Sequence, residues 1–309
     1  MIEMALSMTY EQSLVELMSS PYLDFGIVVN RYLSPLFRYD DGKSSFTCVD
    51  LFDKQRLSPT EGPWPPPEDI PSDLYDSFTL NGLIPVVNSY YNDAYLYHYV
   101  WSTEVINQYR NLTNKCGPYH SAICDLSMST YDVFIRDQIG LVVGSISPWA
   151  EAALFNHGAA KIITVEYADI IADYPNLSIL KPSKLNEIYL SGDWKPVDFI
   201  FTFSSLEHDG LGRYGDPINP FGDVETMYRL HCLLKPDGLL FFGVPTGNDV
   251  LHWNSHRVYG KMRLAMMFQN WWKIVDFFTM DTGSNLTLKL SYNKVIYEES
   301  IWVLQKIGS

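Results

Sequence analysis

The chain has 309 residues, of which 47% are hydrophobic and 15% aromatic, and its formal net charge at pH 7 is -14. This composition excludes an intrinsically disordered chain and provides for one large core with an accessory unit. The acidic charge disfavours binding to nucleic-acid phosphates, and no apolar run approaches the ~20 residues that a membrane span needs.

The compartment is not evident from the sequence. The first residues, MIEMALSMTYEQS, lack the basic and apolar regions of a signal peptide, so a soluble, cytoplasmic protein is the default expectation. The secretory pathway is the alternative if upstream sequence is missing, and three glycosylation triplets suit it, at Asn111, Asn176 and Asn285.

Four cysteines are present, and they form no Cys-x-x-Cys pair, which disfavours a zinc site. Cys116 and Cys124 are close enough in sequence to form a disulfide in an oxidising compartment. Free buried thiols are nevertheless the expectation for all four.

Residues 1–88 show no long periodicity and include a proline-rich, acidic segment, SPTEGPWPPPEDIPSD, at residues 58–73. We interpret this region as an accessory unit with an extended connector, packed over the main domain as a lid or flank. The main domain is expected at residues 89–309. It opens with a predicted helix at residues 92–110, NDAYLYHYVWSTEVINQYR.

From Gly140 onward, the apolar pattern alternates between strands and helices. Parallel strands need crossover connections, so this alternation predicts an α/β fold with a mostly parallel sheet. The predicted helices are 147–158, 223–234 and 258–271. The predicted strands are 141–143, 161–166, 177–180, 197–203, 239–244, 274–278 and 301–305.

The turn after the first of these strands, Gly144-Ser145-Ile146-Ser147, resembles a nucleotide-binding loop with few glycines. Gly144 permits close backbone approach, and Glu166 ends the next strand, where it can accept hydrogen bonds from ribose hydroxyls. Ile146 and Trp149 occupy the second and third glycine positions of the dinucleotide signature, which favours a cofactor with a ribose but no phosphate. S-adenosylmethionine fits. The expected cofactor residues are Gly144, Ser145, Ile146, Ser147, Glu166, Tyr167 and Ser204.

Four segments resemble the motifs of class I methyltransferases: VVGSIS, VEY, FIFTFSSLEH and LLKPDGLLFFGVP. SLEHDGLGRYGDPINPFGD (205–223) and WNSHRVYG (253–260) resemble the family catalogued as domain of unknown function 268. The resemblance implies a doubly wound, Rossmann-like, seven-stranded sheet, mostly parallel with an antiparallel last strand. No acid directly follows the third strand, so Ser183 and Glu187 are the substitutes expected near the adenine.

The loop after the fourth strand should line the pocket beside the transferred methyl group. A hydroxyl acceptor needs a base, and the candidates are His208, Asp209 and His256. The expected substrate-binding residues are Arg213, Tyr214, Asp216, Asn254 and Arg257. Purely structural roles are the alternative: turn capping by the two aspartates, and clamping of the loop by Asn254, His256 and Arg257. No metal is expected, since the spacing of Asp209, Asp216 and His256 does not demand one.

The sequence thus predicts a methyltransferase dependent on S-adenosylmethionine that acts on a small hydroxylated acceptor or a glycan. The alternative is a non-catalytic binding or scaffold protein on the same fold. A nicotinamide-dependent oxidoreductase is disfavoured by the missing glycines. The partner is a small molecule or glycan, with no nucleic acid and no membrane span, and the oligomeric state is not predicted.

Overall fold

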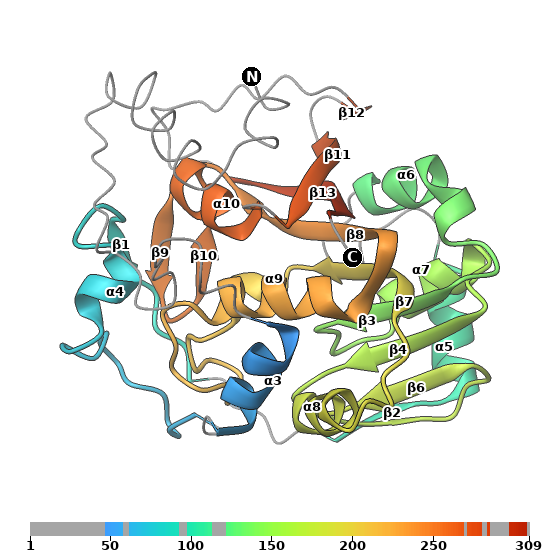
Figure 1. The fold of residues 1–309 in the computed structure, drawn as a ribbon, viewed down its shortest axis with the longest axis horizontal. Coiled ribbons are helices and arrows are strands. Elements are labelled where there is room, and N and C mark those ends of the chain that lie inside the picture. Colours follow the sequence, from blue (N-terminus) through green and yellow to red (C-terminus); the bar gives the residue numbers. More distant parts are fainter. Residues whose placement is uncertain are drawn as a thin grey trace.

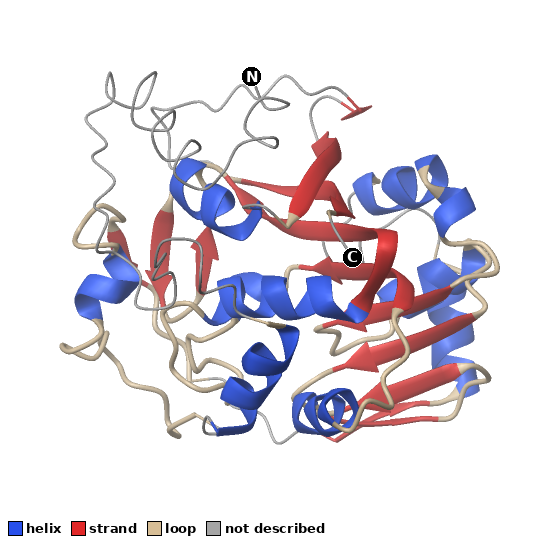
Figure 2. Ribbon diagram, viewed as in Figure 1, coloured by secondary structure: helices blue, strands red, loops and turns tan. Residues whose placement is uncertain are grey.

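The computed structural model describes residues 47–57, 62–92, 98–112, 122–268, 271–279, 283–284 and 297–307. Its centre is a large, mostly parallel β-sheet with helices on both faces (Figures 1 and 2). In spatial order the strands are β12 (Gly283–Ser284), β11 (Trp272–Thr279), β13 (Glu298–Lys306), β8 (Leu234–Thr246), β7 (Val197–Phe203), β3 (Ile139–Val143), β4 (Lys161–Val165) and β6 (Leu177–Leu180).

The strands β6, β4, β3, β7 and β8 run parallel, whereas β13 runs antiparallel to both β8 and β11. This arrangement confirms the predicted Rossmann-like sheet with an antiparallel last strand. All the predicted strands occur among the described residues, and the two-residue strand β12 adds a short pairing beside β11. The strand order reverses at β3, between β4 and β7, which places the topological switch point there.

The two faces of the sheet bury separate apolar clusters because successive strand residues point to opposite sides. Leu141 and Ile200 belong to one cluster, and their neighbours Val142 and Phe199 belong to the other. The first face is covered by α3 (Cys48–Leu57), α8 (Pro182–Leu190), α9 (Gly222–Leu233) and α10 (Lys261–Phe268). The second face is covered by α6 (Ile123–Thr130) and α7 (Trp149–Asn156).

The helix predicted at residues 92–110 is wrong in its first part. Residues 98–101 form strand β2 (His98–Trp101), which pairs in parallel with β5 (Asp169–Ala172), while residues 93–97 lie outside the described part. Ser102 then caps helix α5 (Thr103–Arg110), because its side-chain oxygen accepts a hydrogen bond from Val105 N at 3.3 Å. The apolar residues of this segment fit both the 3.6-residue period of a helix and the two-residue period of a strand. Ser102, the cap residue, marks where the strand ends and the helix begins.

A small second sheet forms in segments for which the sequence predicted no strand. Strand β1 (Val86–Asn88) pairs in parallel with β9 (Val250–Trp253), and β9 pairs antiparallel with β10 (His256–Val258). The helix predicted at 258–271 begins later, as α10, and its first turn is capped by the side chain of Asp249, which precedes the helix in the sequence. The Asp249 carboxylate accepts hydrogen bonds at 3.0 Å from the backbone N–H groups of Gly260, Met262 and Arg263.

The described residues before 89 are joined to the rest of the chain by a disulfide and by strand pairing, among other contacts. Cys48 of α3 forms a disulfide with Cys232 of α9, and β1 adds to β9. Cys124 is also disulfide-bonded, whereas Cys116 lies outside the described residues. The expectation of free thiols is therefore wrong, because the fold brings together cysteines that are 184 residues apart in sequence. The domain boundary at residue 88 stays a prediction.

In the described part of the chain, every helix is too short or too polar to cross a bilayer.

Candidate cofactor and acceptor site

A cavity of about 280 Å³ lies at the carboxyl ends of β3, β4 and β7, at the switch point of the sheet. Ligands of open α/β sheets bind at this position, because neighbouring loops there diverge to opposite faces. The structure brings all the expected cofactor residues to its wall: Gly144, Ser145, Ile146, Ser147, Glu166, Tyr167 and Ser204.

Gly144 is the tightest point of the loop after β3. Its φ is +73°, and a Cβ atom built there would lie 1.7 Å from the Ser205 side-chain oxygen. Its N–H donates to the Val165 carbonyl at 3.0 Å, which holds the loop against the end of β4. The site therefore requires glycine here, on both conformational and steric grounds.

Glu166 connects the ends of β3 and β4, which both border the cavity. Its Oε2 accepts a hydrogen bond from Ser145 N at 2.8 Å, while Oε1 accepts from Tyr167 N at 2.6 Å and from Ala168 N at 3.1 Å. Burial raises the pKa of this carboxyl, although these hydrogen bonds oppose the shift. Oε2 keeps one lone pair for a further donor, such as a ribose hydroxyl.

A second acid, Glu151, supports the loop from below and was missed by the sequence analysis. It is fully buried, and it accepts hydrogen bonds from the Ser145 hydroxyl at 3.1 Å and the Thr164 hydroxyl at 2.7 Å. Burial raises its pKa to about 7. An acid inside the apolar helix segment WAEAALF was the available signal, because a charge there needs buried partners.

The expected adenine partners are not in the cavity. Ser183 and Glu187 are exposed, and Glu187 pairs instead with Lys184 at 2.8 Å. The wall at this end is apolar and consists of Pro182, Leu185 and Phe52. Phe52 comes from α3, and its ring stacks on Tyr189 of α8 at 3.8 Å between ring centres.

His208 lies at the other end of the cavity, in the 3-10 turn η4 (Leu206–His208) that follows β7. Its Nδ1 is 2.6 Å from the Ser255 carbonyl oxygen, which can only accept, so Nδ1 carries the proton and Nε2 carries a lone pair. Nε2 lies 3.6 Å from Glu207 Oε1. Burial lowers the pKa of His208 to about 3, so the neutral ring persists at physiological pH.

Asp209 and Asp216 also line the cavity, and both make local hydrogen bonds. The Asp216 carboxylate accepts hydrogen bonds from the backbone N–H groups of Gly210 and Gly212 at 2.7 and 3.0 Å, which organises the loop. Burial raises its pKa to about 6. Asp209 accepts from the Thr226 hydroxyl at 2.5 Å. Tyr214 lines the cavity as well and meets the His208 ring edge-on at 5.1 Å.

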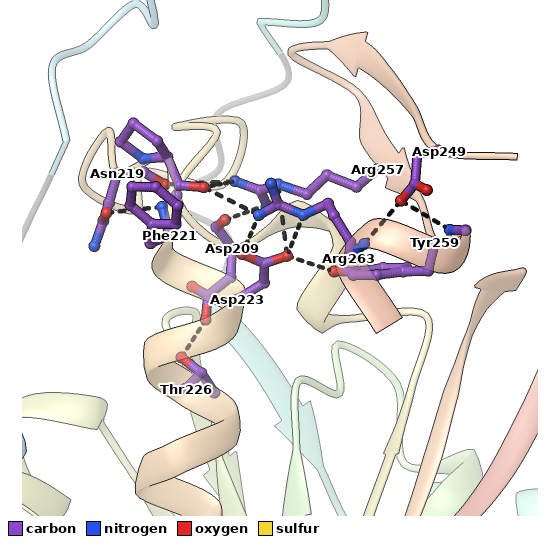
Figure 3. Close-up of polar contacts among 12 residues, drawn as sticks. Asp209, Asn219, Phe221, Asp223, Thr226, Asp249, Arg257, Tyr259 and Arg263 are labelled. Atoms are coloured by element: carbon purple, nitrogen blue, oxygen red, sulfur yellow. Dashed lines mark hydrogen bonds and ion pairs between the residues drawn. The ribbon is translucent and has the colours of Figure 1, made fainter. Parts of the chain in front are cut away.

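Arg257 does not line the cavity. Its guanidinium group reaches toward Asp209 and Asp223 (Figure 3). Its Nη1 donates to the Asp209 carbonyl at 2.5 Å, and its Nε is 3.6 Å from Asp223 Oδ2. Arg263 pairs with Asp223 more closely, at 2.6 Å. Burial alone would raise the pKa of Asp223, but the two guanidinium groups hold it below its usual value. This buried network fixes the loop to α9 and α10.

The remaining predicted residues surround the cavity without lining it. Both side-chain amide atoms of Asn254 bond to the backbone of Tyr91, at 2.8 and 3.0 Å. The Arg213 guanidinium stacks over the Tyr91 ring at 4.5 Å and the Tyr214 ring at 5.0 Å. The His256 ring lies 6.5 Å from that of His208. Across the described residues, no group of three or more His, Cys, Asp or Glu side chains is arranged to hold a metal ion.

Comparisons with solved structures find proteins that this chain resembles at low sequence identity. The N-methyltransferase NodS from Bradyrhizobium japonicum WM9 is 11% identical, with 60% of this chain and 97% of that chain covered and a TM-score of 0.37. The [4+2]-cyclase SpnF is 11% identical, with 81% and 100% covered and a TM-score of 0.44. SMU.776, provisionally assigned as a methyltransferase and solved with SAH, is 12% identical, with 58% and 49% covered and a TM-score of 0.37.

No curated protein matches the chain. A family model described as "Caenorhabditis protein of unknown function, DUF268" matches residues 137–307, which include every strand of the large sheet and the whole loop after β7. The chain therefore belongs to the DUF268 family.

Proposed function

We propose that this protein is a methyltransferase that uses S-adenosylmethionine to methylate an oxygen of a small hydroxylated acceptor or a glycan. The observation that carries the proposal is the meeting of three strand ends around one cavity. The loop at Gly144, the acid Glu166 and the turn at His208 come from β3, β4 and β7, and all three line it.

The residues present suit the cofactor. The backbone of Gly144 leaves room that a side chain would fill, Glu166 Oε2 keeps a lone pair for a ribose hydroxyl, and the apolar wall at Leu185 suits an adenine ring. When bound, S-adenosylmethionine supplies an activated methyl group on its sulfur. The chain must then hold the acceptor oxygen in line with that group and take up its proton.

His208 Nε2 is the group we assign to proton removal. Because its Nδ1–H is held by the Ser255 carbonyl, the ring has one fixed tautomer, and Nε2 is free of a proton before the reaction. Glu207 Oε1, 3.6 Å away, would stabilise the imidazolium that forms. Asp209 and Tyr214 border the same end of the cavity, and we assign them to acceptor positioning.

A non-catalytic binding or scaffold protein is the second candidate, and two observations favour it. Ile146 is 38% exposed at the position where the glycine-rich signature has its second glycine. In addition, three backbone N–H groups already occupy three of the four lone pairs of Glu166. Turnover of labelled cofactor with any acceptor would exclude this candidate.

For the compartment we propose an oxidising one, in place of the cytoplasmic default. Disulfides persist in the secretory pathway and outside the cell, and Cys48–Cys232 is a disulfide here. Asn111 and Asn176, the first residues of two glycosylation triplets, are exposed.

The test is calorimetric titration of the purified protein with S-adenosylmethionine and S-adenosylhomocysteine, beside the variants Glu166→Ala and Glu187→Ala. We expect Glu166→Ala to weaken binding by about tenfold or more, which is about 1.4 kcal/mol. Glu187→Ala removes an exposed acid outside the cavity and should leave the affinity unchanged. Absence of binding to the wild type would contradict the proposal and make the scaffold candidate the leading one.

A further inference from the structure

A second group of polar side chains adjoins the cavity on the far side of His208. We call it the carboxyl–histidine cluster, and its members are Glu207, His252, His256, Tyr297 and Glu299. Glu207 lies in η4 beside His208, the two histidines lie on β9 and β10, and the last two residues lie at the start of β13. None of these residues belongs to the cavity wall that we assign to the cofactor.

The topology explains why these distant residues meet. Because β13 runs antiparallel to β8, its first residues lie at the carboxyl edge of the sheet, where β7 leads into η4. His252 and His256 are direct cross-strand partners, so both rings project from the same face of the small sheet. Their rings stack at 4.5 Å and lie 6.2 and 5.3 Å from the Tyr297 ring.

Four buried polar atoms of this cluster have no hydrogen-bond partner among the described residues: Glu207 Oε2, Glu299 Oε2, His252 Nε2 and His256 Nε2. Glu207 is only 1% exposed. The Nδ1 atoms of the two histidines do have partners, the hydroxyls of Ser89 and Ser255, so each ring leaves only Nε2 unpaired. Buried polar atoms are nearly always paired, and four unpaired ones in one cluster indicate a missing ligand with several hydrogen-bonding groups.

The electrostatics indicate a ligand without charge. Burial raises the pKa of Glu207 to about 7, and burial together with the charge of Glu207 raises that of Glu299 to about 9. Burial lowers the pKa of His256 to about 4, so its ring is neutral. Near pH 7, Glu299 is therefore protonated, Glu207 is divided between its protonated and ionised forms, and the imidazoles are neutral, so the cluster both donates and accepts hydrogen bonds. An anionic ligand would face the residual carboxylate charge and be rejected.

Aromatic rings complete the surroundings. Tyr297 borders both imidazoles, and Tyr214 packs against His208 at the junction with the cavity. Tyrosine rings provide flat apolar surfaces next to polar groups, which matches the C–H faces and hydroxyl groups of a sugar ring. The Arg213 guanidinium, which could have bound an acid, is covered by Tyr91 and Tyr214 and donates to the Ser255 carbonyl at 3.4 Å.

We infer that the carboxyl–histidine cluster binds the hydroxyl groups of a neutral sugar and presents one of them to His208 Nε2. An oxygen can lie within hydrogen-bonding distance of both His208 Nε2 and Glu207 Oε1, because these atoms are 3.6 Å apart. This inference deepens the proposed function and rests on it, since a sugar acceptor is needed only if a methyl group is transferred.

The test measures sugar binding by saturation-transfer NMR and calorimetry in the presence of S-adenosylhomocysteine. The probes are neutral methyl glycosides of galactose, mannose and fucose, with glucuronic acid as the anionic and glucosamine as the cationic counterpart. At least one neutral glycoside should bind, and glucuronic acid should bind about tenfold more weakly or not at all. Glucuronic acid or glucosamine binding as tightly as every neutral probe would overturn the inference.

Variants assign the binding to the cluster. Glu207→Ala and Glu299→Ala should each weaken neutral-sugar binding by about tenfold or more. Glu207→Gln and Glu299→Gln should stay within about threefold of the wild type, because an amide also donates and accepts as a protonated carboxyl does. Glu68→Ala, which removes an exposed carboxyl elsewhere, is the matched control and should have no effect. Sugar binding that is unaffected by both alanine variants would place it outside the cluster and overturn the inference.

Separate titrations with S-adenosylhomocysteine distinguish the two hypotheses. A wild type that binds the nucleoside but no sugar overturns the sugar inference and leaves the methyltransferase proposal intact. A wild type that binds a neutral sugar through the cluster but no nucleoside supports a sugar site and overturns the methyltransferase proposal. If an alanine variant fails to fold, the comparison of neutral and charged probes on the wild type still decides the matter.

Discussion

Gly144 and Glu166 show how single residues shape the side of the cavity that we propose for the cofactor. The φ of Gly144 is +73°, and its N–H bonds to the strand that ends at Glu166. Glu166 in turn accepts a hydrogen bond from Ser145 N, so the loop after β3 is bonded to the end of β4 at two adjacent residues. The loop is therefore shaped before any ligand arrives, which lowers the ordering cost of binding.

Replacement of Gly144 separates two effects of a side chain. Gly144→Ala should abolish measurable S-adenosylhomocysteine binding and lower the melting temperature, because the new methyl group would collide with Ser205 at 1.7 Å. Gly192→Ala is the matched control, since Gly192 also has a positive φ, +80°, but nothing lies within 4 Å of the added atom. The control should lose only about 1 kcal/mol of stability and keep its affinity. Equal losses in both variants would show that strain, and not the contact with Ser205, dominates.

Helix α3 is the element that joins the first described residues to the site. The disulfide from Cys48 to Cys232 anchors it on α9, and one turn later Phe52 lines the apolar end of the cavity. The expectation that residues before 89 pack over the main domain is met for this helix. A cross-link between residues 184 apart constrains the unfolded chain over a long loop.

Breaking this disulfide should both destabilise the protein and weaken cofactor binding. Cys48→Ser and Cys232→Ser should each cost about 2–4 kcal/mol in thermal or denaturant unfolding. The double variant should cost no more than either single one, because each already breaks the same bond. Additive losses would contradict the pairing. Peptide mapping of protein from its natural source should recover the linked pair, and finding all four cysteines free would also remove the argument for an oxidising compartment.

At the scale of the whole molecule, buried acids and histidines set the dependence of stability on pH. Burial raises the pKa of Glu151 and Glu207 to about 7 and that of Glu299 to about 9. The stability these neutral carboxyls contribute is fully present below about pH 4.5 and is lost as the pH rises through the folded values. Burial lowers the pKa of His208 to about 3 and that of His256 to about 4, so these two residues affect stability at acidic pH. They reduce stability as the pH falls below about 6.5, because the unfolded chain then binds protons that the folded one does not.

The melting temperature should therefore fall between about pH 6 and pH 9, and Glu299→Gln should flatten this fall. The amide resembles the protonated carboxyl and cannot ionise, so the variant should melt at least about 2–4 °C above the wild type near pH 9. Scanning calorimetry across this range measures the effect. The control Glu68→Gln changes an exposed side chain and should follow the wild-type curve. A Glu299→Gln curve parallel to the wild type would show that this carboxyl is ionised throughout.

The sequence by itself determined the succession of strands along the chain that build the large sheet, the glycine at the first turn and the acid at the second strand end. These features depend on local patterns: apolar runs of strand length, turn residues, and a spacing that a parallel βαβ unit converts directly into proximity. The small sheet and the strand at residues 98–101 were not predictable in the same way, because their pairing partners are remote in sequence and their apolar spacing fits more than one period.

Only the tertiary structure decided which polar residues lie next to one another and which of them line the cavity. Asn254 and Arg257 bond to backbone outside the cavity, and Cys48 forms a disulfide with Cys232. Phe52 and Leu185 line the cavity, whereas Ser183 and Glu187 do not. Glu207 and Glu299 meet because an antiparallel strand returns to the carboxyl edge of the sheet. Such contacts join segments separated by tens to hundreds of residues. The orientation of a buried polar side chain depends on the hydrogen-bond partners that the fold brings to it, and the neighbouring residues in the sequence do not identify those partners.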